Sequence, residues 1–224
     1  MNSIVENLKE IAGSLPEGVK LVAVSKTKPV EAIVEAYEAG QRVFGENRVQ
    51  ELAEKYEVLP KDIEWHMIGH LQTNKVKYMA AFVSLIHGVE SLKLLETIDK
   101  EGKKHDRVIP CLLQFYIASE ETKFGLDMEE AKALLESADY KNMKNVKIVG
   151  VMGMATNTDD EVQVRREFHH LKEIFDELKA TYFAENPEFK ELSMGMSGDY
   201  RIAVEEGSTM VRVGSSIFGA RNYA

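Results

Sequence analysis

A lysine at the end of an apolar run is the first candidate for covalent chemistry in this chain. The run reads Lys20-Leu-Val-Ala-Val-Ser-Lys26, which is typical of a buried strand, and Pro29 follows where a helix is expected to open. Partial desolvation disfavours the ammonium form of an amine and frees its nitrogen as a nucleophile for Schiff-base formation. The alternative is an ordinary solvated lysine at a strand end. The other motifs of the chain must therefore decide between these two roles for Lys26.

Two turns rich in glycine and serine are candidates for holding an anion. They read Ser193-Met-Gly-Met-Ser197-Gly198-Asp199 and Arg212-Val-Gly214-Ser215-Ser216. Each follows a predicted strand and leads into a short helix, which leaves backbone N–H groups available to phosphate oxygens. The alternative is a pair of ordinary left-handed turns and helix caps. A lysine facing a phosphate site suggests pyridoxal phosphate, with a cofactor-free aldolase lysine as the other use.

The elements that position these residues follow from the alternation of short apolar runs with amphipathic stretches, which indicates βαβ units. Helices are expected over 30–39 and over 159–182, where Val162, Phe168 and Leu171 share an apolar stripe, and an extra helix over about 3–13 precedes the first strand. We expect eight strands, at residues 20–25, 41–45, 63–68, 82–89, 107–116, 145–154, 190–196 and 209–214. Eight strands separated by helices predict a (β/α)8 barrel, although an open doubly wound sheet has the same local pattern.

The barrel prediction has a consequence for the site. Functional residues of such barrels lie at the carboxyl ends of the strands, and the loops after strands seven and eight commonly bind phosphate. Lys26 and both glycine-serine turns fall at these ends. So do Asn47 and Gln50, after the second predicted strand.

Composition excludes several classes of function. The chain has 224 residues, which favours one domain over 1–224, and its net charge of −9 with scattered basic residues argues against a nucleic-acid partner. Cys111 is the single cysteine, so no intramolecular disulfide forms. No stretch is apolar enough for a signal peptide or a membrane span, and we expect a cytoplasmic protein.

The histidines do not form a metal-binding pattern. His66 and His70 are four residues apart but span a strand-to-loop junction and lack the glutamate of a zinc-binding helix. His169 and His170 fall in the middle of a predicted helix and are expected to be solvated. The sequence therefore predicts no metal site.

Five motifs in one order carry a resemblance to a known family. They are Ala23-Val-Ser-Lys26-Thr-Lys, Phe44-Gly-Glu-Asn47-Arg-Val-Gln50-Glu, Glu64-Trp-His-Met-Ile-Gly69-His-Leu-Gln-Thr-Asn-Lys75, Ser193-Met-Gly-Met-Ser197 and Gly207-Ser-Thr-Met-Val-Arg212-Val-Gly214. Together they resemble the YggS/PROSC family of pyridoxal-phosphate-binding proteins, also called PLP homeostasis proteins. The resemblance covers essentially the whole chain.

The resemblance implies a barrel of the alanine-racemase N-terminal type in which Lys26 forms the internal aldimine. It implies that Ser197, Gly214 and Ser215 hold phosphate oxygens and that Arg212 lies beside the pyridine nitrogen. A guanidinium is effectively always protonated, so it opposes protonation of that nitrogen and weakens the cofactor as an electron sink. The implied function is PLP homeostasis without a dedicated reaction, with PLP-dependent apoenzymes as further partners. A PLP-dependent racemase or lyase of the same fold is the alternative.

Some positions leave alternatives open. Asn47 is expected either to contact the ring or its Schiff base, as the matched motif implies, or to cap a helix over 48–56. Met67 and Met152 would either flank the ring or fill the core. Tyr116, in Gln114-Phe-Tyr116, stands where many family members have an asparagine, and its phenol is a candidate replacement.

The resemblance also separates the chain from the racemases. Racemases of this fold add a β-domain, and the partner subunit supplies a catalytic tyrosine. This chain ends ten residues after Gly214, so we expect no such domain. We also expect a monomeric protein. Tyr78, Tyr200 and Tyr223 lie in no recognised motif, and the second base of a racemase is expected to be missing.

Overall fold

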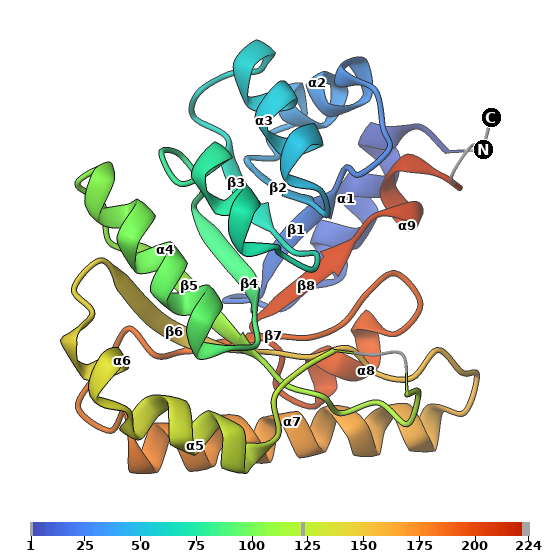
Figure 1. The fold of residues 1–224 in the computed structure, drawn as a ribbon. Coiled ribbons are helices and arrows are strands. Elements are labelled where there is room, and N and C mark those ends of the chain that lie inside the picture. The colour runs from blue at the N-terminus through green and yellow to red at the C-terminus, as the bar shows by residue number, and fades with distance from the viewer. Residues whose placement is uncertain (1, 122–123, 221–224) are drawn as a thin grey trace.

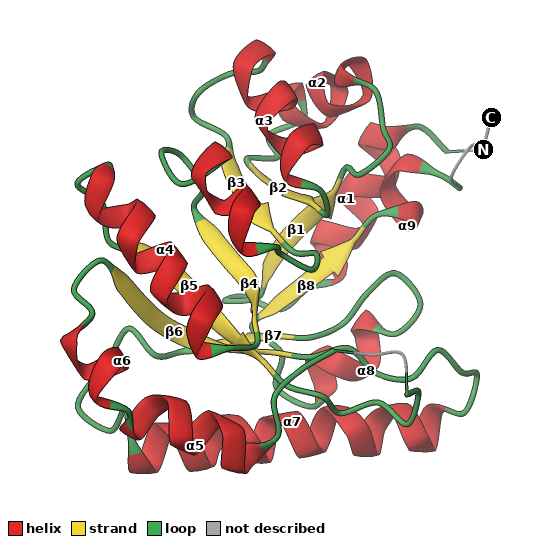
Figure 2. Ribbon diagram, viewed as in Figure 1, coloured by secondary structure: helices red, strands yellow, loops and turns green. Residues whose placement is uncertain are grey.

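The computed structural model describes residues 2–121 and 124–220, and within them eight parallel strands close into a barrel. The strands run in chain order around it, and β8 pairs back onto β1, so that Arg212 stands opposite Val22. Figure 1 shows the helices around the outside, and Figure 2 separates the strands in yellow from the helices in red. The strands are β1 (Lys20–Val24), β2 (Val43–Glu46), β3 (Glu64–Met67), β4 (Leu85–Val89), β5 (Ile109–Gln114), β6 (Val146–Met152), β7 (Glu191–Ser193) and β8 (Met210–Val213). The predicted (β/α)8 barrel is confirmed, and the open sheet is excluded.

Helices connect the strands and include the extra N-terminal helix that the sequence predicts. That helix begins after Ser3, whose hydroxyl accepts from the backbone of Glu6 while the Glu6 carboxylate accepts in return. In the described residues the helices are α1 (Ile4–Ser14), α2 (Val30–Glu38), α3 (Val49–Val58), the 3-10 helix η1 (Thr73–Tyr78), α4 (Leu92–Lys104), α5 (Met128–Glu136), α6 (Ala138–Asn142), α7 (Glu161–Thr181), α8 (Tyr200–Glu205) and α9 (Ser215–Phe218). None of these described helices combines the length and apolarity needed to cross a bilayer.

Side chains alternate along each strand between the barrel interior and the surrounding helices. In β1, Leu21 and Ala23 belong to the large apolar cluster shared with the helices. Val22 belongs instead to a smaller cluster contributed by strands, which fills the barrel. The barrel is therefore a packed core, and ligand space is confined to its ends.

The predicted apolar stripe of α7 is wrong at one position. Val162 is 75% exposed, whereas Val164, Phe168 and Leu171 are buried. Residues four apart share a helix face, so Val164 lies on the same face as Phe168. Val162 is six residues from Phe168 and lies on a different face of the helix.

The seventh strand is shorter than predicted, and this shapes the site. It ends at Ser193 instead of extending to 196, because Gly195 adopts a left-handed φ of 106° that turns the chain. A Cβ at Gly195 would lie 2.8 Å from the Cβ of Ala203 in α8. The early turn lifts Met196 and Ser197 out of the sheet, over the carboxyl end of the barrel.

Candidate functional site

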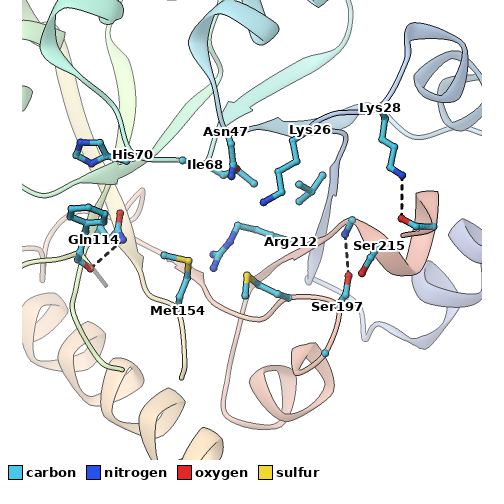
Figure 3. A pocket seen from close by; sticks show the side chains of 17 residues that line it. Lys26, Lys28, Asn47, Ile68, His70, Gln114, Met154, Ser197, Arg212 and Ser215 are labelled. Carbon is cyan, nitrogen blue, oxygen red and sulfur yellow. Dashed lines mark hydrogen bonds between the residues drawn. The ribbon is translucent and has the colours of Figure 1, made fainter. Parts of the chain in front are cut away.

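A cavity of about 490 Å³ opens at the carboxyl ends of the strands. Its volume lies within the range usual for small-molecule sites. All six site residues expected from the sequence line it: Lys26, Asn47, Ser197, Arg212, Gly214 and Ser215. In Figure 3, Lys26, Asn47 and Arg212 point toward a common space, and Ser197 and Ser215 lie beside it.

The backbone around Lys26 is held on both sides. Before it, the Ser25 hydroxyl donates to Glu46 Oε1 at 2.7 Å, and the Ser25 carbonyl accepts from Lys55 Nζ at 2.8 Å. After it, the Thr27 N–H donates to Glu51 Oε1 at 2.6 Å. Thr27 has a left-handed φ of 63°, which is uncommon for a β-branched residue. Lys26 itself is half-buried at the cavity wall.

These contacts meet in one group of charged residues, Glu46, Glu51 and Lys55, which we call the Lys55 cluster. Lys55 Nζ lies 2.6 Å from Glu46 Oε1 and 2.8 Å from Glu51 Oε1. Burial raises the pKa of Glu46 to about 7, although the charge of Lys55 opposes the rise. A single buried ammonium thus bridges the carboxylates that fix the residues on either side of Lys26.

Asn47 lies at the cavity and does not cap a helix. The residue at the N-terminus of α3 is Arg48, which makes no side-chain capping hydrogen bond. The capping alternative for Asn47 is therefore wrong. Gly69 packs closely beside it, because a Cβ there would lie 2.4 Å from the Asn47 carbonyl oxygen. Only glycine fits this approach without moving the backbone.

The two glycine-serine turns come together as the sequence predicts. The Ser197 hydroxyl oxygen accepts from the backbone N–H of Gly214 at 3.2 Å and from that of Ser216 at 3.4 Å. Space at Gly214 is tight, since a Cβ there would lie 3.0 Å from the Val24 carbonyl oxygen. Two amide donors from the start of α9 and one hydroxyl from the β7 turn therefore converge at one wall.

Arg212 approaches the cavity from the barrel interior and is only 3% exposed. Its Nη1 donates to the Ser193 hydroxyl, and its Nη2 donates to the Gly153 carbonyl at 3.2 Å. Burial lowers its pKa to about 10, so the guanidinium remains protonated at neutral pH. It places a fixed positive charge at the floor of the cavity.

Several lining residues are not among the six expected site residues, for example Gln114, Phe124, Met154 and His70. Gln114 Nε2 donates to the Phe124 carbonyl at 3.3 Å, and the His70 ring stacks on the Phe124 ring. Met154 is the last residue of the predicted sixth strand, so the strand-end rule applied there would have found it. Phe124 lies in a loop with no pattern that predicts its position.

Other expected residues lie elsewhere. Tyr116 does not line this cavity: it borders a separate hollow beside α5 and α7, and its hydroxyl donates to the Glu120 carbonyl. Met67 and Met152 are buried in the core, as one of the two alternatives predicts.

The histidines expected not to bind metal have other partners. His66 pairs with His87 inside the barrel, and His70 lies 3.1 Å from Glu90. His169 and His170 are exposed on α7. No cluster of three metal-ligating side chains occurs in the parts of the chain that the structure covers.

Comparison with known proteins places this geometry in a family. Residues 1–222 match the model of the alanine racemase N-terminal domain. A pyridoxal phosphate homeostasis protein of Aquifex aeolicus is 42% identical over 220 residues, covering 98% of this chain and 94% of that protein. The protein of the same name from Escherichia coli is 34% identical over 238 residues, covering 100% and 99%. The chain belongs to the pyridoxal phosphate homeostasis protein family.

Solved structures agree with this family membership. PipY of Synechococcus elongatus, with pyridoxal phosphate bound, has a TM-score of 0.85 and 36% identity, covering 97% of this chain and 100% of that one. Alanine racemase of Bartonella henselae has a TM-score of 0.73 at 18% identity and covers 97% of this chain and 58% of its own. The racemase shares the barrel fold. The resemblance drawn from the five motifs is confirmed.

Proposed function

We propose that this chain binds pyridoxal phosphate at the carboxyl end of its barrel and acts in pyridoxal phosphate homeostasis. Relatives of that name match it over nearly their full length, and the similar PipY structure has pyridoxal phosphate bound. The observation that carries the proposal is the meeting of Lys26, Arg212 and Ser197 around one cavity of cofactor size.

The cavity walls fit the functional groups of the cofactor. Pyridoxal phosphate supplies an aldehyde that condenses with a primary amine, a phosphate, and a ring nitrogen that accepts a hydrogen bond. In the proposal the Lys26 amine takes the aldehyde as a Schiff base. Ser197, Gly214 and Ser215 hold the phosphate, where amide donors already converge on the Ser197 oxygen.

Arg212 and Asn47 complete the proposed site. Arg212 donates to the ring nitrogen, and its positive charge opposes protonation there. The ring then withdraws electrons weakly, which disfavours removal of a proton from a bound amino acid. Asn47 offers an amide beside the ring. Val24, Ile68 and Met154 contribute apolar surface to the same cavity.

The racemase or lyase alternative is less well supported. Racemisation needs an acid–base group on each face of the bound amino acid, of which the cofactor lysine is one. Tyr78 is exposed on η1, Tyr116 borders another hollow and Tyr200 is buried beside α1, so none of these three lines the cavity. Tyr223 lies outside the described residues. Homeostasis is therefore the function we favour.

The proposal extends to the organisation of the protein. We infer a single domain over residues 1–224, a monomer, a cytoplasmic location and transfer of the cofactor to PLP-dependent apoenzymes. The barrel uses strands from residue 20 to residue 213, which supports one domain. The only cysteine, Cys111, is a buried free thiol, which accords with a reducing compartment.

Covalent mapping tests the central claim. The purified chain is incubated with pyridoxal phosphate in phosphate-free buffer, reduced with borohydride, digested and searched for a pyridoxyl label. We expect a yellow protein before reduction and the label on Lys26. Lys26→Ala should lose both, whereas Lys75→Ala, an exposed position on η1, should keep both. A wild-type label on Lys28 or Lys75 instead would overturn the assignment.

A further inference from the structure

A row of hydrogen-bonded polar side chains leads away from Arg212 through the barrel interior. The Ser193 oxygen that accepts from Arg212 lies 3.0 Å from His87 Nδ1, and His87 Nε2 lies 2.9 Å from His66 Nδ1. The exposed fractions of Arg212, Ser193, His87 and His66 are 3%, 0%, 0% and 2%. Strands β4 and β7 are not neighbours, so the contact between His87 and Ser193 crosses the barrel.

The row joins the two ends of the barrel. Arg212 lines the cavity at the carboxyl ends of the strands. His66 lines a separate hollow at the amino ends, together with Lys20 and Glu64, the first residues of β1 and β3. Burying four polar side chains lowers the stability of the fold unless each of them is hydrogen-bonded. We therefore ask what function this buried row serves.

Both histidines are neutral near neutral pH. Burial lowers the pKa of His66 to about 3, and the charge of Lys20 adds to the effect. Burial, His66 and Arg212 hold the pKa of His87 well below its ordinary value. Each ring therefore carries one proton, and its two nitrogens differ, one donating and one accepting.

The direction of the row follows from its fixed end. Arginine has donors only, so Ser193 accepts from Arg212. Within the row, the acceptor in reach of the Ser193 hydroxyl proton is His87 Nδ1, at 3.0 Å. His87 then carries its proton on Nε2 and donates to His66 Nδ1. His66 in turn carries its proton on Nε2. In the reverse arrangement His87 would donate to Ser193, and the buried hydroxyl proton would have no acceptor in this row.

We propose that Ser193, His87 and His66 are positioning residues that hold the Arg212 guanidinium in one orientation at the floor of the cavity. The proposal rests on the proposed function, because Arg212 would meet the ring nitrogen of bound pyridoxal phosphate. The row and the Gly153 carbonyl anchor both terminal nitrogens of the guanidinium. These contacts fix the plane of the guanidinium, so that Arg212 directs an N–H donor toward the ring of the bound cofactor. The preferred ligand is a pyridine with an unprotonated nitrogen.

The protonation pattern can be tested without any ligand. Nitrogen NMR of the histidine-labelled chain near neutral pH, with signals assigned through His66→Asn and His87→Asn, distinguishes the two ring nitrogens. We expect the proton of both rings on Nε2. A proton on Nδ1 of His87 would overturn the proposal, since Ser193 would then be the acceptor from both neighbours.

The positioning role is tested with a pair of ligands. Binding of pyridoxal phosphate is compared with that of its 1-deaza analogue, in which a C–H group replaces the ring nitrogen. We expect the wild-type chain to prefer pyridoxal phosphate, and Ser193→Ala to reduce that preference by about fivefold or more, the scale of one hydrogen bond. Ser193→Thr keeps the hydroxyl and should restore most of the preference.

A matched control separates positioning from general damage. Ser208 is also buried, and its hydroxyl donates to the Met194 carbonyl at 2.7 Å, outside the row. Ser208→Ala should leave the preference between the two ligands unchanged. Equal losses for both ligands in Ser193→Ala would make Ser193 merely structural and overturn the proposal. Failure of the wild-type chain to bind pyridoxal phosphate would instead overturn the proposed function, and the tautomer measurement would still stand.

Discussion

Glu51 holds the turn that follows Lys26, because its Oε1 accepts from the Thr27 N–H at 2.6 Å. The left-handed φ of Thr27 is unfavourable for a β-branched residue and persists only where other contacts impose it. Glu51 is itself held by Lys55. The orientation of Lys26 at the cavity wall thus depends on residues that do not line the cavity.

Removing this contact should weaken cofactor binding. We expect Glu51→Ala to lower the affinity for pyridoxal phosphate about tenfold, roughly the value of one charge-assisted hydrogen bond. Titration of the absorbance of the bound cofactor measures the effect. Glu54→Ala is the matched control, because Glu54 lies on the same helix and bonds to Gln50 instead. Equal affinities in the two variants would show that Glu51 does not position Lys26.

Phosphate binding by the two glycine-serine turns is tested through Ser197. We expect Ser197→Ala to weaken binding of pyridoxal phosphate by about 1–2 kcal/mol while leaving pyridoxal, which lacks the phosphate, nearly unaffected. Both dissociation constants are measured in buffer free of phosphate, since phosphate itself competes. Equal losses for the two ligands would remove Ser197 from the phosphate site.

The homeostasis function predicts little chemistry at the α-carbon of amino acids. Incubation of the cofactor-loaded chain with L- or D-alanine in deuterated water should give little or no α-deuterium incorporation, followed by NMR or mass spectrometry. The physical reason is the guanidinium of Arg212, which in the proposed site lies beside the ring nitrogen and weakens electron withdrawal by the ring. Sustained exchange on the order of 1 per second that disappears in Lys26→Ala would establish the racemase or lyase alternative.

Folding is expected to become acid-sensitive through His66. Its pKa is about 3 in the folded chain, against an ordinary value of 6.5. The unfolded chain therefore binds more protons between these values, and the free energy of unfolding falls as the pH drops below about 6.5. From about pH 7 to about pH 5 the loss due to His66 is roughly 2 kcal/mol.

Urea unfolding at these two pH values measures the effect. In His66→Asn the decline should be smaller than in the wild-type chain by about 2 kcal/mol, whatever the variant does to stability at neutral pH. Titrating groups that do not contact His66, including Glu46, are common to both proteins and cancel in the comparison. The same decline in both proteins would mean that His66 is protonated in the folded state.

The sequence predicts the barrel and six of the residues that line the cavity, because both depend on local patterns. Short apolar runs mark the strands, and polar residues at strand ends gather at one rim once the barrel closes. Asn47 could be assigned to the cavity only from the structure, since the same sequence position suits a helix cap.

What the sequence does not predict is the support behind the site. Lys55 lies in a helix where a lysine is normally solvated, and only the closed fold buries it between Glu46 and Glu51. His87 and Ser193 come from strands that are far apart in the chain and not adjacent in the sheet. Contacts across a barrel interior leave no periodic signal along the chain.

The pairing of β8 with β1 determines at what stage of folding the candidate site can form. Lys26 follows β1, near the beginning of the chain, whereas Arg212 and Gly214 come from β8 and its turn, near the end. A ribosome-bound chain that has not released β8 has Lys26 without Arg212 and without the Gly214 turn that we propose binds the phosphate. With the proposed site, capture of pyridoxal phosphate is therefore a late event that follows the pairing of β8 with β1.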